Sequence, residues 1–145
     1  MITQAMYNEG IEVLTQTINR LEREVSSGRE RSLSDLAQVY ANRGSCYLDV
    51  STTYNANKYR EAISDLSKSV EIFTRLKKDG KSIDENELAK AYGQRGIAYE
   101  AIHELNKALP DMQSGMMIWD RLKRAGKPID ERILDNICFI LGKHQ

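Results

Sequence analysis

The sequence predicts an all-α protein of about six helices arranged as repeated helix pairs, and three observations support this prediction. Only two prolines occur in 145 residues, and residues that favour helix are spread along the whole chain. The octapeptide YANRGSCY at 40–47 returns as YGQRGIAY at 92–99, displaced by 52 residues. The segment at 72–85, IFTRLKKDGKSIDE, returns at 118–131 as IWDRLKRAGKPIDE, displaced by 46. Fixed offsets over long segments are typical of proteins whose structural units stack side by side.

Local chemistry places the ends of the expected helices. Asp84 and Asp130 each follow an isoleucine and precede a leucine by four residues, the pattern of an N-cap with a hydrophobic staple. Gly80 and Gly126 follow basic runs and suit left-handed helix ends. Taken in order along the chain, the expected helices are 3–26, 32–50, 57–78, 84–103, 106–125 and 130–143.

The two displacements differ by six residues, which indicates an insertion between the second and third helices. The segment VSTTYNANK at 50–58 is the place where it fits. We expect a loop or a helix extension to accommodate it.

The repeated octapeptide is predicted to be a packing element. Tyr40, Gly44 and Tyr47 stand at positions i, i+4 and i+7 and therefore share one helix face. Glycine inside a helix costs about 1 kcal/mol relative to alanine, so its presence at both Gly44 and Gly96 indicates that another helix approaches closely. The following helices offer small residues for this contact, such as Ala108.

This arrangement resembles the tetratricopeptide repeat (TPR), an antiparallel helix pair with an aromatic residue, a glycine and a tyrosine on its first helix and an alanine on its second. The matching residues are Tyr40, Gly44, Tyr47 and Ala62 in one repeat and Tyr92, Gly96, Tyr99 and Ala108 in the next. The resemblance implies a right-handed superhelical stack forming a single domain over 1–145. Its parts would be a second-type helix at 3–26, full repeats at 32–78 and 84–125, and a terminal first-type helix at 130–143. Displacements of 46 and 52 exceed the usual ~34 residues, so the helices should be longer than is typical of the family.

Charge and composition bear on the function classes. Lys and Arg together number 21, as do Asp and Glu, so we expect no nucleic-acid partner. No apolar run approaches a membrane span of ~20 residues, and the predicted location is cytoplasmic. Cys46, Cys138, His103 and His144 lack the spacing of a metal site, so neither metal nor cofactor is expected. A catalytic Cys46 would need a base from a distant helix, and we predict no enzymatic activity.

Basic residues leave two interpretations open. Arg43 and Arg95 each precede the repeated glycine, where the guanidinium groups could bind carboxylates in the scaffold, with Asp49 and Glu100 as expected partners, or could contact a ligand. The runs RLKKDGK and RLKRAGK look like phosphate or nucleic-acid sites, but both lie at helix ends, where positive charge complements the helix dipole.

The resemblance also implies a function, because first-type helices of the family line a concave groove that receives an extended peptide or a partner helix. We therefore expect a noncatalytic protein–protein interaction scaffold. The relatives that grip a terminal carboxylate place Lys or Arg where this chain has Ala41 and Gly93, so that clamp is not expected. The candidate partner-binding residues are Gln38, Asn42, Ser45, Asp49, Lys90, Gln94, Ile97 and Glu100.

The alternative is a structural unit that forms homo-oligomers through its terminal helices. A half repeat at each end would leave apolar surface for neighbouring subunits to cover. The residues expected to form that surface are Ile11, Leu14, Ile18 and Leu21 at one end and Ile133, Ile137 and Ile140 at the other.

Overall fold

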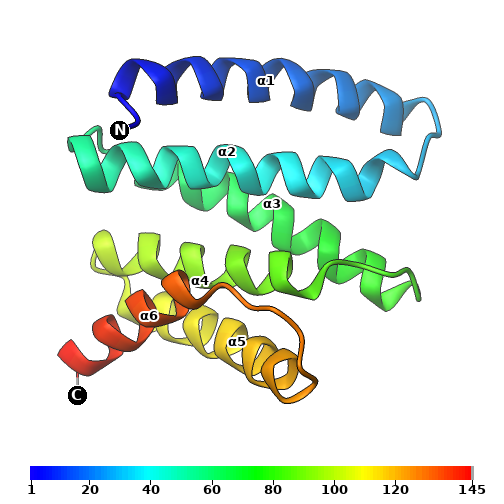
Figure 1. Ribbon diagram of the computed structural model, residues 1–145. Coiled ribbons are helices and arrows are strands. Elements are labelled where there is room, and N and C mark those ends of the chain that lie inside the picture. Colours follow the sequence, from blue (N-terminus) through cyan, green and yellow to red (C-terminus); the bar gives the residue numbers. More distant parts are fainter. Residues whose placement is uncertain (145) are drawn as a thin grey trace. The chain divides into compact units, whose positions relative to one another are not determined.

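The computed structural model describes residues 1–144 and shows six α-helices in this part of the chain (Figure 1), which confirms the predicted all-α class. The helices are α1 (Gln4–Ser26), α2 (Ser32–Tyr54), α3 (Tyr59–Lys78), α4 (Glu85–Ala101), α5 (Leu105–Arg124) and α6 (Glu131–Lys143).

The chain divides into two compact units, residues 1–83 and the residues from Asp84 onward. In the first unit α2 packs against both α1 and α3, and in the second unit α4 packs against α5 and α6. Helices that follow one another within a unit run antiparallel (Figure 1).

The two aspartate N-caps and the two glycine helix ends predicted from the sequence are confirmed. The Asp84 side chain accepts a hydrogen bond from the backbone N–H of Glu87 at 3.2 Å, and the Asp130 side chain accepts one from Ile133 at 3.0 Å. Gly80 and Gly126 adopt φ of 80° and 72°, the left-handed conformation that permits the chain to turn out of α3 and α5. Both α3 and α5 end with the hydrogen bonds of a Schellman motif. The backbone N–H of Lys81 donates to the Leu76 carbonyl, and the backbone N–H of Lys127 donates to the Leu122 carbonyl, both at 2.9 Å.

The insertion between the second and third helices is accommodated mainly by a longer α2. This helix continues to Tyr54, beyond the predicted end at residue 50, and stops at Asn55 with a left-handed φ of 55°. Ser51 holds the extension in place, since its hydroxyl donates to the Tyr47 carbonyl and accepts from the Lys58 N–H. Asn57 then adopts φ of 52°, and His103 adopts φ of 65° at the equivalent position before α5.

The core of the first unit lies along α2. Ile18, Leu21, Leu36 and Tyr40 form one buried cluster between α1 and α2. On another side of α2, a methyl group at Gly44 would lie 2.8 Å from Leu66 Cγ on α3 and 3.3 Å from the carbonyl oxygen of Ala62. The close helix approach predicted at Gly44 is therefore confirmed.

The second unit repeats this contact and adds α6. A methyl group at Gly96 would lie 2.7 Å from Met112 Cγ and 3.1 Å from the Ala108 carbonyl oxygen. Trp119 is fully buried, and its indole N–H donates to the Asn86 side-chain oxygen at 2.8 Å. The same oxygen accepts from the Asp130 N–H at 3.2 Å, so one amide connects α4, α5 and the start of α6.

The apolar residues expected to lie exposed at the chain's two ends are instead covered by their own units. Five of them are buried, and the remaining two, Ile11 and Leu14, are half-buried. The buried five are Ile18, Leu21, Ile133, Ile137 and Ile140. Tertiary packing inside each unit uses the surface that the sequence suggested was free for self-association.

None of the helices in the described residues has a stretch both long and apolar enough to span a membrane.

Candidate functional site

Four of the candidate binding residues lie together on one face of α2, which we call the Asn42 face. Gln38, Asn42, Ser45 and Asp49 are separated by four, three and four residues, the spacing of neighbours along a helix. Asn42 is exposed, and the other three side chains are half-buried. The Gln38 amide nitrogen donates to Asn42 Oδ1 at 3.0 Å, so these two side-chain amides are hydrogen-bonded to each other on α2.

The other four candidates lie together on α4, where one is buried and three are half-buried. Gln94 is only 6% exposed, although the displacement of 52 makes it the counterpart of the exposed Asn42. Lys90, Ile97 and Glu100 are half-buried.

Ion pairs connect both ends of this α4 face to α6. Lys90 Nζ lies 3.6 Å from the Glu87 carboxylate and 4.0 Å from that of Asp130 at the start of α6. Near the end of α6, the Glu100 carboxylate lies 3.9 Å from Lys143 Nζ and 3.4 Å from His144 Nε2. These groups are therefore engaged within the second unit, while Asn42 in the first unit is exposed.

The arginines that precede the repeated glycines form two equivalent ion pairs with the next helix. Arg43 donates through Nε and Nη2 to both carboxylate oxygens of Asp65, at 2.7 and 2.8 Å. Arg95 makes the same two-bond contact with Asp111, at 2.6 and 2.7 Å. Hydrogen bonds to the Asp65 carboxylate raise the pKa of Arg43 above its usual value.

The expected carboxylate partners of these arginines, Asp49 and Glu100, were therefore wrong. Both actual partners are almost fully buried, with Asp65 3% and Asp111 7% exposed. They are related by the displacement of 46, just as the two arginines are related by 52, so the repeat pattern held the signal that would have identified them. The pairs hold each hairpin together, in agreement with the structural interpretation of these arginines.

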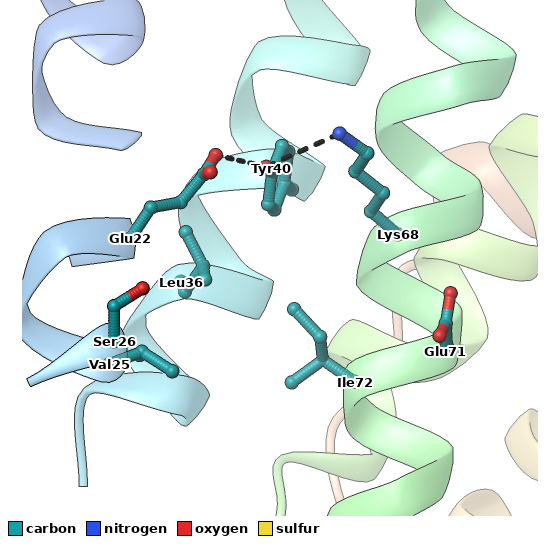
Figure 2. A pocket seen from close by; sticks show the side chains of 8 residues that line it. All are labelled: Glu22, Val25, Ser26, Leu36, Tyr40, Lys68, Glu71 and Ile72. Atoms are coloured by element: carbon teal, nitrogen blue, oxygen red, sulfur yellow. Dashed lines mark hydrogen bonds between the residues drawn. The ribbon is translucent and has the colours of Figure 1, made fainter. Parts of the chain in front are cut away.

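A hollow of about 300 Å³ opens between α1, α2 and α3, and we call it the Tyr40 hollow. Figure 2 shows Glu22 of α1 and Lys68 of α3 on either side of the Tyr40 hydroxyl. That hydroxyl donates to the Glu22 carboxylate at 2.5 Å, and Lys68 Nζ lies 3.5 Å from it. Burial, followed by the hydrogen bond to Glu22, raises the pKa of Tyr40 well above the usual value of 10.0. The full lining is Glu22, Val25, Ser26, Leu36, Tyr40, Lys68, Glu71 and Ile72.

The Tyr40 hollow and the Asn42 face are separate surfaces. At 100° per residue, Tyr40 and Asn42 lie about 160° apart around α2. Sequence reasoning could not find the hollow, because its walls come from three helices and no repeat pattern relates them.

Within the described residues, no group of three or more His, Cys, Asp or Glu side chains is arranged to hold a metal ion. Cys46 is half-buried, and burial raises the pKa of its thiol above the usual value. A raised pKa keeps this thiol protonated and weakly nucleophilic at neutral pH.

Comparisons with protein-family models, with curated proteins and with solved structures found no match for this chain.

Proposed function

We propose that this chain is a noncatalytic protein-interaction scaffold of the TPR-like type, a superhelical stack of helix hairpins forming one cytoplasmic domain over 1–145. Its first-type helices would bind a peptide or a partner helix. The observation that favours this function most is the exposed Asn42, held by Gln38 on the first-type helix α2.

An amide at this position suits the recognition of a peptide backbone. An asparagine side chain carries two N–H donors and a carbonyl oxygen with two lone pairs. The hydrogen bond from Gln38 uses one lone pair of Asn42 Oδ1 and orients the amide, so that both N–H donors and one further acceptor position can serve a peptide group. Because the Asn42 amide is already oriented before binding, less side-chain entropy is lost when a partner associates.

The Arg–Asp pairs support the same proposal, because they make the helices that present these groups rigid. Arg43 connects three helices, since it also donates to the Thr15 hydroxyl on α1 at 3.1 Å. A binding surface on a helix fixed in this way keeps its geometry when the partner leaves.

The experiment that tests the proposal combines partner capture with paired substitutions. The chain is used to capture a binding protein, and that protein's affinity is measured for Asn42→Ala, Gln94→Ala and the double variant beside their melting temperatures. We expect Asn42→Ala to weaken binding by about threefold to tenfold without lowering the melting temperature, as for loss of one net hydrogen bond. Gln94→Ala should lower the melting temperature because Gln94 is buried. Retained affinity in the double variant would rule out the Asn42 face as the binding surface.

A second candidate function is self-assembly, and the exposed Phe139 and Val13 favour it. Phe139 on α6 is 70% exposed and Val13 on α1 is 61% exposed. Sedimentation at ~100 μM distinguishes the two functions, because a scaffold for other proteins would sediment as a monomer. A dimer or larger species that Phe139→Lys or Val13→Lys dissociates would favour self-assembly.

A further inference from the structure

A second hollow, of about 310 Å³, lies between the start of α2 and the end of α3, and we call it the loop-end hollow. Its walls are formed by residues of the turn before α2, the first turn of α2, the last turns of α3 and the loop that follows α3. Its lining consists of Glu30, Arg31, Leu33, Ser34, Arg75, Leu76, Asp79, Lys81 and Ser82.

Three cationic side chains surround this hollow without carboxylate partners. In the described part of the chain, no carboxylate lies within 4.0 Å of the charged groups of Arg31, Arg75 or Lys81. Glu30 and Asp79 also line the hollow, so its formal charge at neutral pH is three positive less two negative, or +1. A single negative charge would balance it.

In the second unit, a carboxylate neutralises the equivalent arginine. Arg121 corresponds to Arg75 through the displacement of 46, and its Nη2 donates to the Glu85 carboxylate at 2.6 Å. Glu85 corresponds to Leu33 through the displacement of 52. The first unit thus has an apolar side chain where the second has the carboxylate that neutralises the arginine.

This difference separates the loop-end hollow from the general role of basic residues at helix ends. Arg75 and Arg121 both lie in the last turn of their helices and complement the helix dipole equally well. The dipole explains why an arginine recurs at this position. It does not explain why Arg75 faces a hollow with an apolar wall.

The leucines that line the hollow indicate that its ligand carries an apolar part beside the negative charge. Leu33 is half-buried and Leu76 is 9% exposed, so both present hydrocarbon surface at the edge of the core. We infer that the loop-end hollow binds a small organic monoanion, a carboxylate carried on a short apolar chain, with the carboxylate beside Arg31, Arg75 and Lys81 and the chain against Leu33 and Leu76. This site is independent of the Asn42 face and of any partner bound there.

The test is a titration of the 145-residue chain with hexanoate at constant ionic strength, followed by backbone amide NMR. We expect saturable shifts in residues 31–34 and 79–82. Each methylene buried against the leucines should tighten binding by about threefold to fourfold, so acetate should bind much more weakly. Hexanol, which lacks the charge, should also bind much more weakly.

Matched variants assign the binding to the hollow. Arg75→Ala should weaken hexanoate binding by about tenfold, as for loss of a charged hydrogen bond. Leu33→Glu supplies the carboxylate that the second unit has and should weaken binding by a similar factor. Arg121→Ala removes the equivalent arginine and should leave the affinity unchanged within twofold. A circular dichroism melt of each variant checks folding. Because Arg75 is exposed, we expect Arg75→Ala to fold, and this variant tests the inference if Leu33→Glu does not fold.

Several results would overturn the inference. Shifts that rise linearly without saturation, or equal losses in Arg75→Ala and Arg121→Ala, would show only weak attraction to surface cations. Equal affinity for hexanol and hexanoate would show an apolar hollow without anion selectivity, and equal affinity for acetate would remove the role of the leucines.

Discussion

At the scale of single residues, the glycines of the repeated octapeptide have opposite requirements to the glycine of α1. Gly96 faces the backbone of α5, since an added methyl would lie 3.1 Å from the Ala108 carbonyl oxygen, whereas nothing lies within 4 Å of a methyl at Gly10. We expect Gly96→Leu to destabilise the fold by about 1 to 3 kcal/mol through overpacking. Gly10→Ala should stabilise it by up to about 1 kcal/mol through helix propensity. Thermal melts of the two variants check both values, and a Gly96→Leu protein as stable as the parent would disprove the close approach.

The Arg95–Asp111 pair should be much more important for stability than an exposed ion pair of the same type. Asp111→Ala leaves the guanidinium of Arg95, whose side chain is 18% exposed, without its carboxylate, and we expect a loss of about 3 kcal/mol. The matched control is Asp120→Ala, which breaks a pair with Arg124 whose side chains are 80% and 61% exposed. That change should cost less than about 0.5 kcal/mol. Urea denaturation of both variants measures the difference, and equal losses would contradict the structural role of the buried pair.

Tyr40 should make stability decline at alkaline pH. Its pKa in the folded protein lies above the usual 10.0, so the contribution of its neutral hydroxyl is fully present below pH 10. Above that pH the unfolded chain ionises first, and the contribution is lost as the pH rises toward the folded pKa. We expect the parent to exceed Tyr40→Phe by about 1 kcal/mol at pH 8 and by progressively less above pH 10. A difference that stays constant from pH 8 to pH 11 would show that burial does not perturb this phenol.

The sequence allowed some of these residue-level features to be predicted and concealed others. Gly44 and Gly96 could be interpreted because glycine in a helix is costly and recurs at a fixed offset. Helical spacing alone points Arg43 and Arg95 toward carboxylates on their own helices, whereas the actual partners are aspartates on the next helix, at positions that also recur.

At the scale of elements, the placement of α6 on α4 depends on the small size of Gly93. A methyl at this position would lie 2.8 Å from Ile137 Cδ1 and 3.1 Å from Trp119 Cη2. Gly93→Ala should therefore destabilise the second unit by about 1 to 3 kcal/mol. Ile137→Val removes the atom in closest contact and should cost about 0.5 to 1.5 kcal/mol alone.

The double variant Gly93→Ala with Ile137→Val isolates this contact. Because the shorter side chain makes room for the added methyl, its destabilisation should be smaller than the sum of the two single losses. Chemical denaturation of the four proteins completes the cycle. Strictly additive losses would show that Gly93 and Ile137 do not limit how closely α6 approaches α4.

Helix boundaries were predictable where a side chain caps the end and less so where tertiary contacts decide. Asp84 and Asp130 begin α4 and α6 as their sequence patterns indicate. The end of α2 lies beyond the predicted residue because Val50 and Ser51, each 1% exposed, are buried and extend the helix past the matching point in the second repeat. No local sequence pattern at 50–58 indicates that Val50 and Ser51 are buried.

At the scale of the whole molecule, equal numbers of acidic and basic residues leave recognition to local surfaces. The repeat pattern predicted which side chains of α2 share a face, because helical spacing alone determines it. It could not predict that Asn42 would be exposed and its counterpart Gln94 buried, since burial depends on tertiary packing and not on helical spacing. The candidate binding residues are therefore not equivalent, and Asn42 is the better probe of function.

The most direct test of the interaction-scaffold proposal is calorimetric titration of a captured partner into Asn42→Arg and into Ser64→Arg. Both positions are exposed on helices, on α2 and α3 respectively, so neither change should lower the melting temperature appreciably. The arginine at position 42 places a bulky charge on the Asn42 face, and we expect it to weaken binding by at least tenfold, whereas Ser64→Arg should leave the affinity unchanged. Equal affinity of the two variants would contradict the proposal that partners bind along this face of α2.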